Sequence, residues 1–353
     1  MMALAAATGS AQAPPAAPAT PDDTPSIRLG TTLFPNYTFQ SEPEITDADG
    51  NLVHRNAFDV SRAYLNITGN ISHLIAFRLT PDIARETNPA SSLSGSLVLR
   101  IKYAYAQANL DEWTGGGSYA RLGIQQTPYL DYMEGIYRYR FQGTMFVERQ
   151  GYFASSDAGA SFHYNFPSNY GDVHGGVFNG ENYQKAEVND QKDFMIRASV
   201  RPFAQGDAAL RGLRGAVFYD AGHYVKDAER KRLIGAATYE HQHVTAGFEY
   251  LDAHDQTSIA TANLHSRGYS IWATPKQSAT SVGWEGLIRY DHLTPNTAQD
   301  DQKQSRVITG IAYWFPHQGN VTSALMLDYD GQIFKNVTTA PNKSVILHGL
   351  VNF

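Results

Sequence analysis

The chain has no cysteine and no long hydrophobic run. Without cysteine it forms neither a disulfide staple nor a thiolate metal site. No segment approaches the roughly 20 consecutive apolar residues that a membrane-spanning helix needs, so a helical membrane protein is excluded. Outside short turns in the long connections, the apolar residues also lack the 3.6-residue period of amphipathic helices. These absences leave the β-strand as the main secondary structure.

Aromatic residues and glycine, in contrast, are plentiful. The 353 residues include 21 tyrosines, 17 phenylalanines and 30 glycines. A sheet whose strands meet lipid on one face and water on the other has this mixed aromatic and polar composition. Composition therefore favours one large closed sheet over two soluble domains.

Alternation of apolar and polar residues predicts about sixteen strands between residues 27 and 353. The runs are about 9 to 14 residues long, which is the length that a tilted strand needs to cross a bilayer. They are 27–39, 58–68, 72–80, 96–110, 118–127, 157–166, 172–181, 192–203, 213–224, 231–242, 243–253, 264–275, 279–293, 305–315, 321–334 and 344–353. The predicted fold class is therefore all-β, a transmembrane antiparallel β-barrel.

The connections between these runs alternate in length. Those after the odd-numbered runs are predicted to be long and polar, such as 41–56 and 82–93, and those after the even-numbered runs are mostly short, such as 69–70. This parity is typical of an outer-membrane barrel with both termini on the periplasmic side and long external loops. An even number of strands lets the first and last strands pair, which leaves no unpaired edge in lipid.

The last run supplies a second indication of an outer-membrane barrel. Its alternate residues Val345, Leu347, Val351 and Phe353 fall on one face, and the chain ends on an aromatic residue. This ending resembles the signal that the barrel-assembly machinery recognises, so we expect that machinery and outer-membrane lipid as partners. The expected location is the bacterial outer membrane.

The amino-terminal residues are expected to lie outside the barrel. Residues 1–13 contain the small-x-small sequence 11–13 of a signal-peptidase site, and we interpret them as the remnant of a signal peptide. Residues 14–26 are rich in proline and alanine and are interpreted as a periplasmic linker. A disordered alanine-rich tail is the alternative. The barrel itself is assigned to residues 27–353.

The stretch from 118 to 156 has the most unusual pattern in the chain. A short strand runs up to Pro128, which cannot donate to a sheet, and a long charged and aromatic connection follows. A loop of this length inside a compact domain is usually functional. We therefore interpret it as a third external loop that folds into the lumen and narrows it. Side chains suited to an aqueous constriction are Tyr129, Asp131, Glu134, Tyr137, Arg138, Tyr139, Arg140, Glu148 and Arg149.

Assigning the apolar residues to lipid forces the residues between them into the lumen, because the side-chain period is two. With Leu97, Leu99, Ile101 and Tyr103 facing out, the cations of that strand face in. The five cations that this rule places in the lumen on neighbouring strands are Arg62, Arg78, Arg100, Lys102 and Arg121. Placing Arg62 and Arg78 on one face requires a three-residue turn with a glycine bulge near 69–70.

The second half of the wall is predicted to carry both charges. The inward residues there are Arg197, Arg201, Arg214, Arg289, Asp220, Glu249, Glu285 and Asp291. Clustered arginines attract anions and bind phosphate or carboxylate through charge-assisted hydrogen bonds. The net charge of −6 leaves a second interpretation open, in which lumen charges only solvate a water-filled wall and pair across it.

Several short motifs resemble those of the phosphate-selective porin O and P family. They are residues 125–129, 146–149 and 159–161, together with 60–65 ahead of a glycine turn. The resemblance covers about the first half of the chain. It implies a sixteen-stranded homotrimeric channel whose lumen arginines and lysines guide phosphate or polyphosphate. The residues that carry over are Arg62, Arg149 and the loop after Pro128.

Other chemistry has weaker support. The sequence 47–50 begins like a calcium loop but lacks the glutamate expected at its twelfth position, and His241 and His243 lack a third ligand. Ser161 and His163 share a strand face without a nucleophile motif. We therefore expect no enzymatic activity, no cofactor, no metal and no nucleic-acid partner.

The sequence thus predicts a porin for passive diffusion of small hydrophilic solutes, with anions such as phosphate as the expected solutes. In this hypothesis the five wall cations face Tyr137, Arg138, Arg140, Glu148 and Arg149 across the constriction. The alternatives are a non-specific general porin and a barrel whose external loops bind a partner.

Overall fold

The structure of the protein is a computed structural model, which describes residues 23–114, 116–299, 302–319, 321–335 and 339–353. The expected signal-peptide remnant at 1–13 lies outside the described residues, as does most of the expected linker at 14–26. In the described part of the chain, no helix has both the length and the apolar character to cross a membrane.

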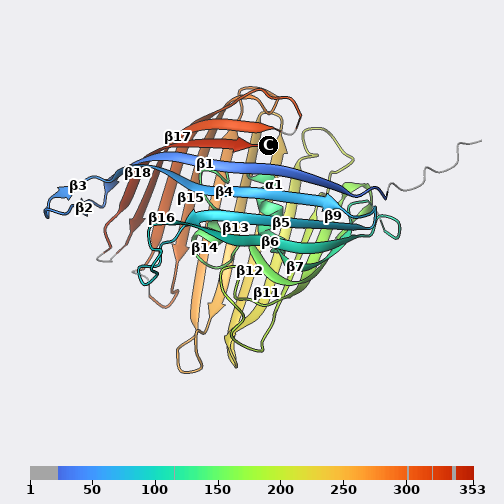
Figure 1. Ribbon diagram of the computed structural model, residues 1–353, viewed down its shortest axis with the longest axis horizontal. Coiled ribbons are helices and arrows are strands. Elements are labelled where there is room, and N and C mark those ends of the chain that lie inside the picture. The colour runs from blue at the N-terminus through green and yellow to red at the C-terminus, as the bar shows by residue number, and fades with distance from the viewer. Residues whose placement is uncertain (1–22, 115, 300–301, 320, 336–338) are drawn as a thin grey trace, which may run out of the picture.

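Sixteen strands of the described chain form one closed antiparallel barrel (Figure 1). They are β1 (Ser26–Glu42), β4 (Asn56–Asn70), β5 (Ile75–Arg85), β6 (Leu97–Asn109), β7 (Tyr119–Gln126), β8 (Ser156–Asn165), β9 (Gly171–Phe178), β10 (Asp193–Val200), β11 (Leu213–Val225), β12 (Ala228–His241), β13 (Val244–Asp255), β14 (Leu264–Pro275), β15 (Gly283–Thr294), β16 (Gln304–Trp314), β17 (Thr322–Phe334) and β18 (Asn342–Asn352). Each strand pairs with the next along the chain. The predicted sixteen-stranded barrel is confirmed.

The barrel closes where β1 meets β18. Thr31 and Phe353 exchange backbone hydrogen bonds of 3.0 and 3.1 Å, and the two strands stay paired up to Glu42 and Lys343. The start of β1 and the carboxyl-terminal Phe353 therefore lie at one end of the barrel, which we call the terminal end. The opposite end, which carries residues 43–55, 86–96 and 179–192, is called the loop end.

Side chains alternate between the two faces of the wall. Large apolar residues such as Leu99, Leu122 and Ile288 are 60–69% exposed on the outside. Charged residues such as Glu249 and Arg289 are buried on the inside. This is the reverse of a soluble protein and fits a wall with lipid outside and polar groups inside.

The hairpin between β4 and β5 differs in detail from the prediction. The turn comprises residues 71–74 and not 69–70, because both strands continue further and Asn70 pairs with Ala76. In this register Thr68 lies opposite Arg78, so that even-numbered residues of both strands share the inner face. Arg62 and Arg78 therefore face the lumen together without the expected three-residue turn.

The prediction that Tyr103 faces lipid is wrong. The register between β5 and β6 shifts at Pro81, where Thr80 pairs with Tyr103 but Pro81 pairs with Ile101. Proline cannot donate to the ladder, and the extra residue of a bulge reverses the faces beyond it. Lys102 and Tyr103 consequently both line the interior, at 4% and 7% exposure.

The predicted alternation of long and short connections holds for most of the chain but fails at two connections. The connection between β10 and β11, predicted to be short, comprises the twelve residues 201–212. Residues 225–230 were expected in a long loop, yet β11 and β12 are joined only by Lys226 and Asp227. The other residues expected in this loop extend β11 and β12 instead. Asp227 adopts the positive φ of 66° that such a tight turn needs. The loop at 43–55 contains a small hairpin of β2 (Ile45–Thr46) and β3 (Leu52–Val53).

The two faces of β18 provide a test of this wall. Leu347 faces outward near the middle of the strand and is 43% exposed, whereas Ile346 faces an internal cavity. We expect Leu347→Arg to lower the free energy of unfolding by about 2–4 kcal/mol, because a charge then meets hydrocarbon. The matched control Ile346→Arg should cost clearly less. Equilibrium unfolding of both variants in lipid vesicles measures the difference, and equal losses would contradict the assigned faces.

Candidate functional site

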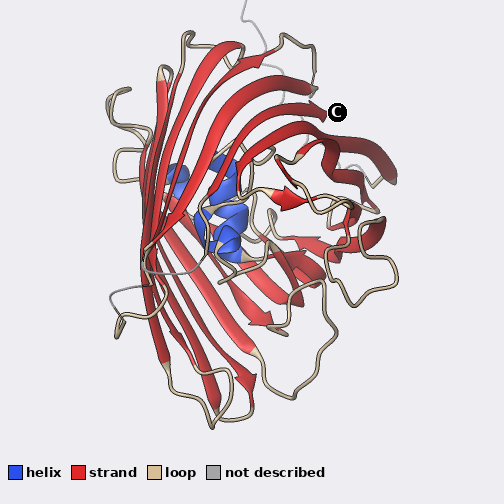
Figure 2. Ribbon diagram, turned by 90° about the vertical axis from the view of Figure 1, so that its left-hand side faces the viewer, coloured by secondary structure: helices blue, strands red, loops and turns tan. Residues whose placement is uncertain are grey.

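Residues 127–155, which we call the inner segment, connect β7 to β8 through the interior of the barrel. Figure 2 shows its two helices, α1 (Pro128–Ile136) and α2 (Phe146–Arg149), surrounded by strands. Pro128 ends the strand before it, as expected, and also begins α1, where its missing N–H costs no hydrogen bond.

One face of the inner segment is apolar. Its buried residues pack against inward-facing apolar residues of β9 to β17. Tyr137 lies edge-on to Trp272 with ring centroids 4.9 Å apart, and Tyr139 lies edge-on to Trp314 at 5.6 Å. The helix-forming signal was present in the sequence, because Tyr129, Leu130, Met133, Ile136 and Tyr137 recur with a helical period. This side of the lumen is therefore a packed core.

Polar groups of the same wall hold the backbone and ends of the inner segment. The hydroxyl of Tyr129 donates to Glu249 Oε2 at 2.7 Å. Arg197 donates to the Pro128 carbonyl and Arg289 to the Thr144 carbonyl, each at 3.1 Å. Buried carbonyls need such partners in the absence of water. Many of the mixed charges in the second half of the wall thus position the inner segment.

Three cavities adjoin the inner segment: two lie on the side of β1, β4 and β18, and the third lies against β8 and β10 to β12. A cavity of about 590 Å³ lies toward the terminal end, one of about 250 Å³ lies against β1, β4 and β18, and one of about 420 Å³ lies toward the loop end. Arg140 borders the first two cavities, and Arg62 borders the second and third. Neighbouring cavities therefore share lining residues, and the series runs from the terminal end toward the loop end.

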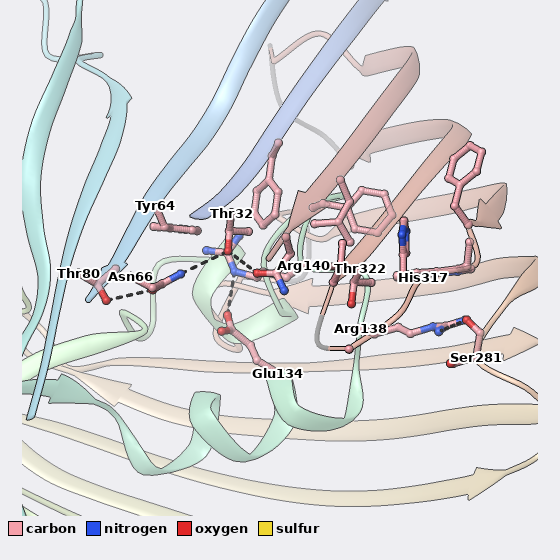
Figure 3. A pocket seen from close by; sticks show the side chains of 18 of the residues that line it. Thr32, Tyr64, Asn66, Thr80, Glu134, Arg138, Arg140, Ser281, His317 and Thr322 are labelled. Carbon is pink, nitrogen blue, oxygen red and sulfur yellow. Dashed lines mark hydrogen bonds and ion pairs between the residues drawn. The ribbon is translucent and has the colours of Figure 1, made fainter. Parts of the chain in front are cut away.

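Charged pairs stand where the cavities adjoin. Arg140 donates to Glu134 at 2.8 Å and lies 3.6 Å from Glu148, and Figure 3 shows the Arg140–Glu134 pair beside the wall. Arg62 donates to the buried carboxylate of Asp82 at 2.7 Å. Both arginines are thus held where the cavities adjoin, Arg140 by two carboxylates and Arg62 by one, and such pairing restricts their rotamers.

Two cations of the 590 Å³ cavity lack an ion-pair partner in the part of the chain that is described. Arg78 donates to Asn66 at 3.0 Å and lies over the Tyr103 ring, with its guanidinium carbon 4.4 Å from the ring centroid. Lys102 Nζ lies 4.8 Å from the Tyr64 ring centroid and 3.4 Å from the Tyr64 hydroxyl. Aromatic faces stabilise these cations without neutralising them.

The remaining residues predicted for the constriction occupy different places. Arg138 lines the 590 Å³ cavity, is paired with Glu285 and stacks on Trp314. Arg100 lies nearer the loop end, where it donates to Gln184 at 3.3 Å.

Arg121, Arg149 and Tyr137 contribute mainly to packing and pairing. Arg121 stacks 3.9 Å from the Tyr119 ring centroid. Arg149 lies 3.8 Å from Asp330, and burial beside other guanidinium groups lowers the pKa of Arg149 to about 10, so it is still a cation at neutral pH. Tyr137 is 1% exposed within the apolar core.

The serine considered for a hydrolase belongs to a buried hydrogen-bond network. Ser161 lies 3.1 Å from His174 Nε2, and its hydroxyl donates to Gln125 at 2.5 Å. His163 instead contacts Asp172 at 2.8 Å. A hydroxyl whose proton is donated to an amide oxygen is not activated by a histidine base.

No family model matches the sequence, and no curated protein matches it. Solved structures share the fold. An anion-selective porin from Comamonas acidovorans has a TM-score of 0.63 at 11% identity, over 94% of this chain and 100% of that porin. The outer membrane channel DcaP of Acinetobacter baumannii gives 0.62 at 9% identity, over 93% and 97% of the two chains. The trimer form of OmpT from Vibrio cholerae gives 0.60 at 12% identity, over 93% and 100%. The chain has the porin fold.

The porin fold is a fold of the bacterial outer membrane, which is where the sequence predicts this chain to be. The outer apolar wall and the closed seam meet the two requirements of that location, a lipid-compatible surface and no unpaired strand edge.

Two tryptophan substitutions test whether the contact between Tyr137 and Trp272 holds the inner segment in place. Trp272→Ala removes the buried ring that contacts Tyr137, and such truncations cost about 3–5 kcal/mol of packing. We expect the inner segment to be held less firmly, so that single-channel recordings show larger current fluctuations. Trp284→Ala is the matched control, because Trp284 is 50% exposed on the outside of the neighbouring strand. Recordings in which both variants match the wild type would contradict the anchor.

Proposed function

We propose that the protein is a porin that lets small hydrophilic solutes diffuse passively across the outer membrane. The observation that carries this proposal is a series of three adjoining cavities, two beside β1, β4 and β18 and one against β8 and β10 to β12, with Arg140 and Arg62 where they adjoin. Porin-fold neighbours support it at the level of fold. The terminal end is assigned to the periplasm and the loop end to the exterior.

We further propose that the pore prefers anions, phosphate among them. The lining of the 590 Å³ cavity includes four cations and one carboxylate among the described residues, namely Arg78, Lys102, Arg138, Arg140 and Glu134. Arg78 and Lys102 have no carboxylate partner among those residues. A wall of low dielectric constant strengthens their attraction for an entering anion.

The 420 Å³ cavity toward the loop end has a different balance. Its described lining contains the cations Arg62, Lys185, Arg230 and Arg232 and the carboxylates Glu148, Glu181, Asp157, Asp193 and Asp220. A mixed lining of this kind gives little preference for either sign of charge. The preference for anions is therefore assigned to the 590 Å³ cavity, which lies toward the proposed periplasmic end.

The oligomeric state and the family are further parts of the proposal. The resemblance to the phosphate-selective porins and the trimer form of OmpT support a homotrimer. The proposed solute path follows the three cavities of a single protomer.

The first experiment measures the reversal potential of the purified protein in a planar bilayer under a KCl gradient. A potential with the sign set by chloride, together with conductance reduced by phosphate on one side, is the result expected of an anion-preferring pore. A cation-selective or unselective channel that ignores phosphate would leave a general porin. Absence of conductance would contradict the channel and favour a barrel that binds a partner through its loops.

The cations without ion partners are the residues to change. We expect Arg78→Gln combined with Lys102→Met to move the reversal potential toward zero, because the cavity loses two cations that have no ion-pair partner among the described residues. Arg85→Gln combined with Lys231→Met removes the same number of cations from outward-facing positions and should leave the potential unchanged. If the inner pair has no effect, or both pairs have the same effect, anion preference does not arise in this cavity.

A further inference from the structure

A second polar cluster lies on the outside of the barrel, away from the channel. It consists of Asp252 and His254 on β13 and His265 and Arg267 on β14. In the strand register His254 lies opposite His265, and Asp252 lies opposite Arg267. All four face outward, because the alternate residues of both strands, such as Ala253 and Ser266, are buried on the inner face.

The three possible ligand atoms converge on one point. Asp252 Oδ1 lies 2.9 Å from His265 Nε2 and 3.1 Å from His254 Nε2. The two imidazole rings are stacked with centroids 4.1 Å apart, and the Nε2 atom of each contacts Asp252 Oδ1. All three ligand atoms lie within 4.8 Å of one another.

Arginine completes the arrangement without competing for the ligand atom. Arg267 Nε donates to Asp252 Oδ2 at 2.9 Å, which is the oxygen that neither histidine contacts. Partners of this kind orient a metal-binding carboxylate and leave its other oxygen free. The side chains of Asp252, His254 and His265 are 20%, 45% and 28% exposed, so an ion can reach them from solvent.

We propose that Asp252, His254 and His265 form a binding site for a divalent transition-metal ion of the zinc type. Two imidazole nitrogens and one carboxylate oxygen are a common ligand set for such ions, with a fourth position left for water. Bonds of about 2.0–2.1 Å in a tetrahedral site separate ligand atoms by about 3.3 Å. The observed separations of 2.9 and 3.1 Å therefore need to open by only a few tenths of an ångström.

The site depends on two strands, which explains why the sequence did not predict it. Along each strand the pattern shows only one histidine beside one charged residue, and the third ligand comes from the neighbouring strand. The pair His241 and His243 was considered from the sequence instead. Their ring centroids are 5.7 Å apart, and no carboxylate contacts either of them in the described part of the chain.

The test is a zinc titration of the full chain without an affinity tag, purified in detergent and freed of metal. Competition with a chromogenic chelator should show one tight zinc site in the wild type. His254→Ala with His265→Ala should weaken that site by at least about 100-fold, the upper end of what loss of an outer partner costs. His241→Ala with His243→Ala is the matched control and should bind zinc as the wild type does.

Two further measurements keep the outcome clear. Asp252→Asn keeps the size of the side chain and should also weaken zinc binding, so the proposal can be judged if the alanine pair fails to fold. Co²⁺ in the wild type should give the intense visible absorption of a four-coordinate site, which His254→Ala with His265→Ala should lose. Equal zinc affinity in the wild type and in these variants, or equal loss in the His241 and His243 control, would overturn the site. Conductance plays no part in the readout, so the channel and the metal site are tested separately.

Discussion

The hydrocarbon of a membrane offers no water to a backbone amide, so the sheet has to close on itself. In this chain the closing contact is the exchange of hydrogen bonds between Thr31 and Phe353. In a closed sheet each strand side chain faces either the lipid outside or the lumen inside, because successive residues alternate between the two faces. Outward apolar residues and inward charges follow from this alternation, and the proposed channel depends on it.

The inner segment is amphipathic and divides the lumen into a packed apolar part and a part that contains cavities. Its apolar face packs against Trp272, Trp314 and the neighbouring wall, and its charged residues Glu134, Arg140 and Glu148 lie on the other face. The three cavities adjoin this charged face, two of them near the seam and one against β8 and β10 to β12. This division accounts for the charges of the wall, since Glu249 and Arg289 hold the inner segment while Arg78 and Lys102 meet the cavity.

One proline changes the chemistry of the 590 Å³ cavity. The bulge at Pro81 turns both Lys102 and Tyr103 toward the interior, and Tyr103 then stacks with Arg78. Without this bulge strict alternation would place Tyr103 in lipid and remove an aromatic surface from two cations. The aromatic contacts stabilise the cations without an ion pair to any described carboxylate, which is the property that the proposed anion path needs.

The sequence by itself determined the strand number, the faces of β18, the position of the segment after Pro128 and the inward direction of Arg62 and Arg78, because a period of two needs no coordinates. The tertiary structure decided the rest. It determined which cations are paired, that Tyr137 belongs to a core, and that Asp252 meets two histidines across a strand pair. These outcomes depend on the register of neighbouring strands and on contacts between distant residues, and a pattern along one strand contains neither.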